Sequence, residues 1–376
     1  MSSLNDPPAQ ARPLYLVRSS LQLLLASALA EQARRDGQAQ PCLLFLPDLQ
    51  DPALFGHALQ AWAQTPFEQT ITLEPRHVPG GPTHRRTWHD LDAELTRAVR
   101  RWRPTCVTVF NDRQDAGQRV LIEAARSFPT ARRLCAEDGA QAYTGYVYRR
   151  LGMVTRWRQK LRMGPQWCDV RVLGTHPLVQ EFLALYPDLL RPELRTRAVR
   201  PFPSAALGAP CLRELALDFC RRLDWDPAEL DDCGALLTLN HSTYAQRNPH
   251  YVELVQGCVQ AMRKAGIAFA YKYHPRETQS DYLGLARSSD ARQMPRVLPV
   301  EMAYLLCRGH RLLVIAGMST SLLTAALLLP CAQTLALVHA SRHGDQWDAR
   351  LLEALRIHPA GDADGVALWL TRNLDR

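Results

Sequence analysis

The sequence lacks the signatures of several protein classes. None of its 10 cysteines forms a C-x-x-C pair, so neither a zinc site nor a redox motif is indicated. The apolar run Leu322–Leu329 is far shorter than the roughly 20 residues needed to cross a bilayer. There is no secretory signal, no internal repeat and no nucleic-acid-binding module. We therefore expect a cytoplasmic protein without a nucleic-acid partner, and any membrane contact should be peripheral, at the inner face of the cytoplasmic membrane.

What is present describes an ordinary globular chain with an excess of positive charge. Its 376 residues exceed what one hydrophobic core usually serves, so two domains are expected. The net charge is +8, and almost all of the positive charge is arginine. Such a surface suits anionic ligands, namely nucleotides, acidic sugars or lipid headgroups. The base composition of the genome is the alternative explanation.

Strand-like and helix-like patterns alternate along the whole chain, which predicts an α/β fold with parallel sheets. Predicted strands lie at 14–17, 42–46, 70–73, 106–110, 132–136, 170–173, 235–239, 267–273, 312–316 and 334–338. The proline- and glycine-rich stretch 200–210 is typical of a linker. We predict a GT-B architecture: two Rossmann-like domains facing each other across a cleft, at 13–200 and 211–345. A helical segment at 346–376 is expected to pack back on the first domain.

The first candidate site is Glu137-Asp138-Gly139, directly after a predicted strand. Two adjacent carboxylates at a strand end can share one proton-transfer task, with one accepting the proton and the other raising its pKa. Gly139 permits the tight turn that such an arrangement needs. A solvated turn is the simpler alternative.

The second candidate is the strand end Lys272-Tyr273-His274-Pro275. Proline restricts the residue before it to extended conformations, which limits where His274 points. A histidine there can protonate or hydrogen-bond a phosphate leaving group, and Lys272 adds positive charge. A capping histidine in a turn is the alternative. Asn240 and His241, after another predicted strand, are candidates for the same site, with His241 a rival to His274.

The third candidate joins a predicted strand to a helix through Ser319, Thr320 and Ser321. Hydroxyls and unpaired backbone N–H groups at a helix start form an anion site, although a plain N-cap explains the same residues. Strand-end residues of the first domain complete the set as candidates for holding acceptor or donor hydroxyls. They are Arg18, Ser19, Ser20 and Asn111.

The order of these motifs resembles that of the bacterial sialyltransferases of GT-B architecture. That group carries an acidic D/E-D/E-G motif, a His-Pro motif and a Ser-Ser/Thr motif, which appear here as Glu137-Asp138-Gly139, His274-Pro275 and Ser319-Thr320. The opening 15–24 and the segment 298–301 look like the bacterial polysialyltransferase and lipooligosaccharide sialyltransferase families. The resemblance covers the chain from Tyr15 to about Pro330.

The resemblance implies an inverting, metal-independent transfer of sialic acid, or a related nonulosonic acid, from a CMP-sugar donor. The acceptor would be a glycan hydroxyl, lipid-linked or free, in capsule or lipopolysaccharide synthesis, with no cofactor. Glu137 would be the general base, Asp138 its neighbour, and His274 would stabilise the departing phosphate held by Ser319 and Thr320. No Asp-x-Asp motif of the metal-dependent kind is present. The Ser-Thr-Ser sequence leaves open which two hydroxyls touch phosphate.

Two other functions stay open. A sugar-nucleotide epimerase of GT-B-like fold would prefer UDP to CMP and convert its substrate without an acceptor. A non-catalytic protein that binds an anionic glycan or a membrane surface is the third hypothesis. The segment 146–167, basic and rich in aromatic residues, can lie on an anionic membrane or grip an anionic glycan. A solvated helix face that packs against the first domain is the simpler explanation, and the one we favour from sequence.

Overall fold

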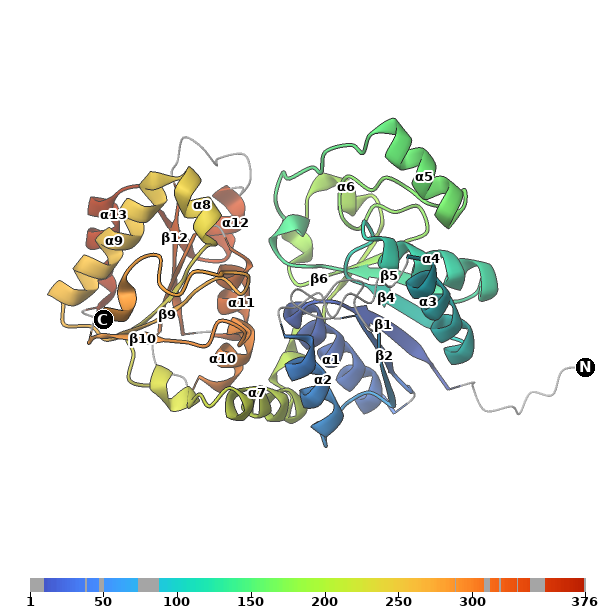
Figure 1. Cartoon of the computed structure of the whole chain (residues 1–376), viewed down its shortest axis with the longest axis horizontal. Coiled ribbons are helices and arrows are strands. Elements are labelled where there is room, and N and C mark those ends of the chain that lie inside the picture. The colour runs from blue at the N-terminus through green and yellow to red at the C-terminus, as the bar shows by residue number, and fades with distance from the viewer. Residues whose placement is uncertain are drawn as a thin grey trace, which may run out of the picture. The chain divides into compact units, whose positions relative to one another are not determined.

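The chain folds into two units that each contain a parallel sheet covered by helices (Figure 1). The computed structural model describes residues 10–37, 39–46, 51–73, 88–287, 289–307, 312–317, 319–329, 331–338 and 349–374. The N-terminal unit comprises 1–142 and 146–212, and the C-terminal unit comprises 143–145 and 213–376. The division after Leu212 falls inside helix α7 (Pro210–Arg222), just beyond the predicted linker.

The N-terminal unit holds a seven-stranded parallel sheet with the order β3-β2-β1-β4-β5-β6-β7. The strands are β1 (Pro13–Val17), β2 (Cys42–Phe45), β3 (Gln69–Thr72), β4 (Cys106–Val109), β5 (Arg132–Ala136), β6 (Glu181–Ala184) and β7 (Ala198–Pro201). The helices are α1 (Ser20–Arg35), α2 (Pro52–Ala61), α3 (Trp88–Trp102), α4 (Asp115–Ser127), α5 (Met153–Met163) and α6 (Pro192–Arg195). The strand order reverses between β1 and β4, and open α/β sheets bind ligands at that place.

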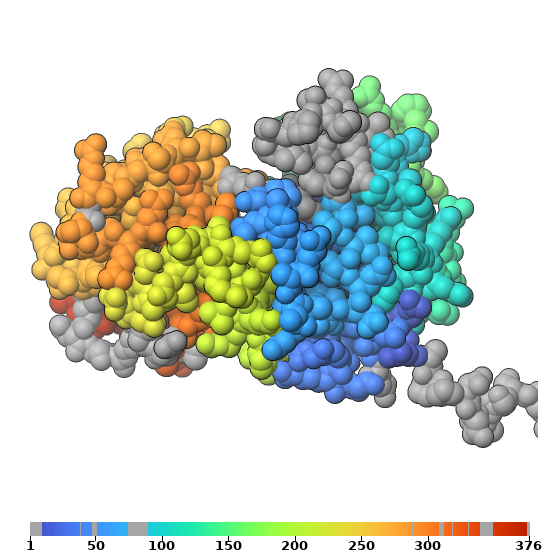
Figure 2. Space-filling view, turned by 60° about the horizontal axis from the view of Figure 1, so that its bottom comes forward, coloured from blue at the N-terminus to red at the C-terminus, as the bar shows by residue number. Residues whose placement is uncertain are grey.

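The C-terminal unit repeats the plan with a six-stranded parallel sheet, in the order β10-β9-β8-β11-β12-β13. The strands are β8 (Ala235–Thr238), β9 (Phe269–Lys272), β10 (Ala291–Gln293), β11 (Leu313–Ala316), β12 (Gln333–Leu337) and β13 (Ile357–Ala360). The helices besides α7 are α8 (Ser242–Arg247), α9 (Pro249–Lys264), α10 (Val300–Leu306), α11 (Thr320–Leu328), α12 (Ala349–Ala354) and α13 (Ala363–Leu374). In Figure 2 the surface of this unit is coloured from yellow-green at α7 to orange for later residues. Here the order reverses between β8 and β11.

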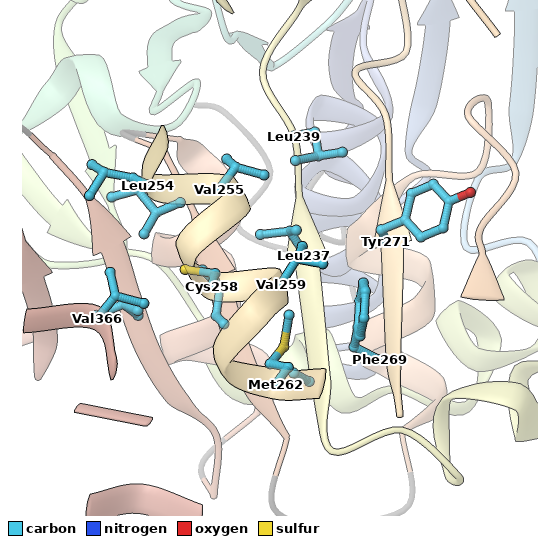
Figure 3. Close-up of a cluster of buried hydrophobic side chains, with 14 of the residues drawn as sticks. Leu237, Leu239, Leu254, Val255, Cys258, Val259, Met262, Phe269, Tyr271 and Val366 are labelled. Atoms are coloured by element: carbon cyan, nitrogen blue, oxygen red, sulfur yellow. The ribbon is translucent and has the colours of Figure 1, made fainter. Parts of the chain in front are cut away.

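A buried cluster joins the sheet of the C-terminal unit to its covering helices (Figure 3). Helix α9 contributes Val255, Cys258, Val259 and Met262 to the cluster, each at most 4 % exposed. These positions recur at helical spacing, so one side of α9 packs on the strands while the other meets solvent. Phe269 of β9 belongs to the same cluster.

Two local predictions were wrong or incomplete. The apolar run at 170–173 is not a strand, although Val170 and Val172 are buried. Side chains bind the backbone of this stretch and its surroundings: the Arg113 guanidinium donates to the Val170 carbonyl, and the Gly174 amide donates to the Asp112 carboxylate. The next strands are β6 and β7, and β7 takes up the start of the predicted linker.

The C-terminal segment belongs to the second unit by its contacts, and that it also packs back on the first domain stays a prediction. Residues 346–348 and 375–376 lie outside the described residues. Of the remainder, β13 pairs with β12, and α13 packs along α9 (Figure 1). Val366, Trp369 and Leu370 of α13 belong to the same buried cluster as α9, and Val366 is labelled in Figure 3. Apolar side chains at helical spacing pack this helix against the core of the C-terminal unit.

No helix in the part of the chain that the structure describes is long and apolar enough to span a membrane.

Candidate functional site

Three neighbouring strands of the C-terminal unit bring the predicted histidine and hydroxyl motifs to one edge of the sheet. Strand β8 pairs in parallel with β9 on one side and with β11 on the other. The carboxyl ends of parallel strands meet at the same sheet edge, so the loops after β9, β8 and β11 lie next to one another. These loops carry His274, His241 and the hydroxyl run that begins at Ser319.

His241 is held in one orientation by bonds at both ring nitrogens. Its Nε2 lies 3.1 Å from the Arg276 carbonyl oxygen, which can only accept, so Nε2 carries the proton. Its Nδ1 then accepts from the Thr243 amide at 3.2 Å, which caps helix α8. The hydrogen-bond pattern therefore assigns the tautomer of His241 and engages both nitrogens within the protein.

His274 lies against His241, with the two ring centroids 5.7 Å apart in an edge-to-face arrangement. Its Nδ1 accepts from the Arg276 amide at 3.1 Å. Partial burial, then electrostatic interactions with His241, Lys272 and Arg276, lower the pKa of His274 to about 4. The ring is consequently neutral near pH 7 and carries its proton on Nε2. Within the described residues, that Nε2 has no hydrogen-bond partner.

A buried carboxylate ties the loop of His274 to the loop of His241. Glu277 is 3 % exposed and accepts hydrogen bonds from the amide of Ser242 at 2.6 Å and its hydroxyl at 3.0 Å. The amides of Thr278 and Gln279 donate to the same carboxylate, each at 2.9 Å. Burial alone would raise the pKa of Glu277, but these hydrogen bonds outweigh it and hold the pKa below its usual range.

The three hydroxyls at the start of α11 have different surroundings. Ser319 is the N-cap, and its Oγ accepts from the amide and from the hydroxyl of Ser321, at 3.3 and 3.0 Å. The Ser321 hydroxyl also lies 2.9 Å from that of Thr238 on β8 and is nearly buried. In the described ranges, the hydroxyl of Thr320 has no partner, and Thr320 is partly exposed. Of the three, Ser321 is engaged and buried, whereas within the described residues the O–H groups of Ser319 and Thr320 have no acceptor and can donate to a ligand.

Glycine allows the loop after β11 to approach the loop after β8. A Cβ built on Gly317 would lie 2.5 Å from Nδ2 of Asn240, a contact that no side chain can make. The backbone of Asn240 is held in place, because its N–H donates to the Tyr251 hydroxyl at 3.0 Å and its carbonyl oxygen accepts from the Tyr282 hydroxyl at 2.7 Å. At the reversal between β8 and β11, the backbone of Gly317 thus packs against the side chain of Asn240.

Lys272 points into the interior instead of joining the histidines. Its Nζ donates to the Arg296 carbonyl at 2.8 Å, and burial lowers its pKa to about 8, opposed by the charge of Glu301. Burial also raises the pKa of Glu301. Lys272 therefore influences His274 through its charge and presents no ammonium group to a ligand. Pro275, by contrast, is exposed next to His274.

A second polar cluster forms in the N-terminal unit, where β1, β4 and β5 end side by side. Asp138, after β5, is partly buried, and the polar side chains of Gln22 and Asn111 near its carboxylate favour the charged form. Burial raises its pKa, while these bonds and the charge of Arg18 oppose the rise. Arg18 donates from Nη1 to the Gln114 side chain at 2.6 Å.

Glu137 lies in different surroundings from its neighbour. It is 2 % exposed, and its Oε2 accepts from the Leu185 amide at 2.6 Å, beyond the end of β6. Successive side chains of an extended backbone point to opposite sides, which separates the two carboxylates. Gly139 follows with φ of 85°, a left-handed conformation that favours glycine. The structure thus places Asp138, and not Glu137, among Arg18 and Asn111.

Several residues of these clusters escaped the sequence analysis. Gln22, Gln114 and Glu277 each act through side chains from neighbouring elements, and no local pattern marks them. Ser19 and Ser20, which were predicted, form the start of α1, where the Ser19 hydroxyl accepts from the Gln22 amide at 3.2 Å. Among the described residues, no group of three His, Cys, Asp or Glu side chains converges to hold a metal ion. That the protein works without a metal ion or a cofactor stays a prediction.

No family model and no curated protein sequence matches the chain. Solved structures do match in fold. UDP-GlcNAc 2-epimerase from Methanocaldococcus jannaschii is similar at 13% identity and TM-score 0.57, covering 97% of this chain and 93% of that one. The UDP-GlcNAc 2-epimerase of Neisseria meningitidis, solved with UDP-GlcNAc bound, is similar at 10% identity and TM-score 0.56, covering 97% and 91%. Sialyltransferase from Photobacterium damsela is similar at 11% identity and TM-score 0.51, covering 95% and 80%.

These similarities confirm the fold class: two parallel-sheet α/β domains of the GT-B-like kind. They also correct the functional expectation. The main interpretation, transfer of sialic acid from a CMP-sugar, is wrong, because several structures with TM-scores between 0.50 and 0.57 are UDP-GlcNAc 2-epimerases or UDP complexes. The alternative that we left open, a sugar-nucleotide epimerase of GT-B-like fold, agrees with them better. Short motifs misled us because strand-end histidines and hydroxyls serve any phosphate-bearing ligand.

Proposed function

We infer that the chain is an epimerase acting on a UDP-sugar, with the nucleotide bound by the C-terminal unit. The observation that supports this most is the edge formed by the ends of β9, β8 and β11. There the first turn of α11, the Thr320 hydroxyl and the Nε2–H of His274 are all hydrogen-bond donors suited to phosphate oxygens. The helix dipole adds partial positive charge at the same end.

His274 acts in this proposal as a hydrogen-bond donor. With a pKa of about 4 in the free protein, it is neutral at physiological pH and donates from Nε2. A bound diphosphate would favour the protonated ring and raise that pKa. His241 donates its Nε2 proton to the Arg276 carbonyl oxygen and positions its neighbour.

Within the N-terminal unit, Asp138 is the group that we propose for acid–base chemistry. Epimerisation breaks a C–H bond of the sugar, with the proton passing to the Asp138 carboxylate, and forms a C–H bond on the opposite face of the same carbon with a proton from solvent, so no atom is gained or lost. A carboxylate with a raised pKa is a stronger base than an exposed one, and burial gives Asp138 that property. The UDP-sugar is chosen because the matched structures of Neisseria meningitidis and Methanocaldococcus jannaschii hold UDP-GlcNAc.

The first test is calorimetric titration with UDP and with CMP. We expect UDP to bind more tightly than CMP. The Thr320→Ala variant should weaken UDP binding about tenfold, since a hydrogen bond to a charged group contributes about 1.5 kcal/mol or more. Thr371→Ala, which removes a hydroxyl from helix α13, is the matched control and should bind as the parent does. Tighter binding of CMP would contradict the proposal.

The second test is catalytic. UDP-GlcNAc is incubated with the protein in D2O without an acceptor, and NMR follows solvent deuterium entering the sugar and the appearance of an epimer. We expect both with the parent chain, and loss of both with Asp138→Asn while UDP binding persists. An epimer that forms equally fast with Asp138→Asn would remove this residue from the mechanism. UDP binding without any exchange would refute the epimerase activity.

A further inference from the structure

The exposed apolar side chains of this protein concentrate on one helix. Of the eight large hydrophobic residues exposed in the described part of the chain, six lie between Tyr146 and Leu161. Four of them are on α5, with exposed fractions of 82 % for Met153, 63 % for Val154, 65 % for Trp157 and 66 % for Leu161. In a helix of 3.6 residues per turn these four fall within an arc of roughly 100°. We call them the α5 apolar face.

The opposite side of α5 attaches the helix to the N-terminal unit through polar contacts. Gln159 donates to the Asp115 carboxylate at 3.2 Å, and Arg162 pairs with the same carboxylate at 2.7 Å. Arg162 also reaches Asp92 at 3.4 Å, and Met163 is buried against Ile122. An ordinary surface helix buries its apolar side and exposes its polar side. Helix α5 does the reverse: its polar side faces the N-terminal unit and its apolar side is exposed.

Basic residues surround the α5 apolar face. Arg158 and Lys160 flank it on the helix, one at either side of the apolar arc, and both are exposed. Three further basic residues nearby along the chain are exposed as well: Arg149, Arg150 and Arg171. From 146 to 168 the sequence contains no aspartate or glutamate. Apolar side chains bordered by long cationic ones match a surface with anionic groups above a hydrocarbon interior.

We propose that α5 docks the protein on an anionic lipid surface, with the apolar face inserted among acyl chains and the flanking cations at the headgroups. A protein partner fits less well, because a stable interface takes roughly 20 or more residues from each side, and this surface has four apolar ones on a single helix. A purely polar glycan would leave Trp157 and Leu161 without apolar contacts. Figure 1 shows α5 at the margin of the N-terminal unit, away from its sheet. The proposal does not depend on the enzymatic function.

The test is flotation of the full chain with two kinds of vesicle, phosphatidylcholine alone and a mixture of phosphatidylcholine with phosphatidylglycerol. We expect binding to the mixed vesicles that weakens as salt is raised, and little binding to phosphatidylcholine. Leu161→Ser should lower the affinity about tenfold, from the lost burial of one leucine side chain. Lys160→Ser should lower it about fivefold. Brominated lipids should quench the parent's tryptophan fluorescence more than that of Trp157→Phe.

Two exposed residues of the C-terminal unit give matched controls. Leu368 on α13 is 52 % exposed, and Leu368→Ser should leave vesicle binding unchanged within about twofold. Lys264→Ser, on α9, is the control for Lys160→Ser. The proposal is overturned if the parent binds neither vesicle, or if Leu161→Ser and Leu368→Ser bind alike. Retention on a heparin column with no vesicle binding would overturn it too and point to an anionic glycan.

Discussion

Replacing Glu277 tests whether one buried carboxylate holds the two histidine loops together. In Glu277→Ala, the amide and hydroxyl of Ser242 lose their acceptor at a site where Ser242 is 5 % exposed. The amides of Thr278 and Gln279 also lose theirs, but these residues are exposed and water can replace the carboxylate. Counting the two buried donors alone, we expect a loss of about 3 kcal/mol in the stability of the C-terminal unit.

The pH range of this effect follows from the pKa of Glu277. Because that pKa is lower in the folded protein than in the unfolded chain, the stabilisation is fully present above the unfolded value of about 4.3. It is lost as the pH falls through the folded value. The difference between parent and Glu277→Ala should therefore be constant from about pH 5.5 to 8 and shrink in more acidic solution.

Hydrogen exchange followed by mass spectrometry is the assay, since a chain of two units need not unfold in one step. Peptides covering 236–246 and 270–282 should exchange faster in Glu277→Ala, and the urea midpoint of the C-terminal unit should fall. Glu253→Ala is the control, because Glu253 has a 72% exposed side chain and pairs only with His250 at its surface. Unchanged protection of both peptides in Glu277→Ala would refute the view that this carboxylate connects the loops.

Three further predictions concern single groups. His274→Gln should remove a stability loss that the parent shows between about pH 6.5 and 4, because the folded ring resists protonation there while the unfolded ring accepts it; thermal melts across that range measure it. Gly317→Ala should weaken UDP binding, since its Cβ forces the Asn240 carboxamide away from the loop after β11; calorimetry measures it, and unchanged affinity would place the nucleotide elsewhere. Asp112→Asn should cost about 2 kcal/mol in urea unfolding, because the Gly174 and His176 amides each donate to one carboxylate oxygen at 2.8 Å, and the carboxamide nitrogen that replaces one of these oxygens cannot accept.

The sequence by itself determined the fold class and most of the strands. Short runs such as 42–45 and 313–316 are apolar and buried at every position, which is the pattern of a parallel strand covered by helices on both faces. It also indicated the helix start at Ser319, because serine before a helical run is a strong cap. The run at 170–173 was predicted as a strand and is not one. Its backbone is hydrogen-bonded to a side chain distant in sequence, and a local sequence pattern does not reveal such a partner.

Only the tertiary structure decided which groups form the candidate sites. The order of strands in each sheet brings His241, His274 and Thr320 to one edge, and strand order depends on pairing between distant segments. The direction of each side chain separated Glu137 from Asp138, although the two are adjacent in sequence. Likewise the amphipathic pattern of α5 predicted a helix but not which side faces solvent. That was settled by Asp92 and Asp115, whose carboxylates hold the polar side and leave the apolar side exposed.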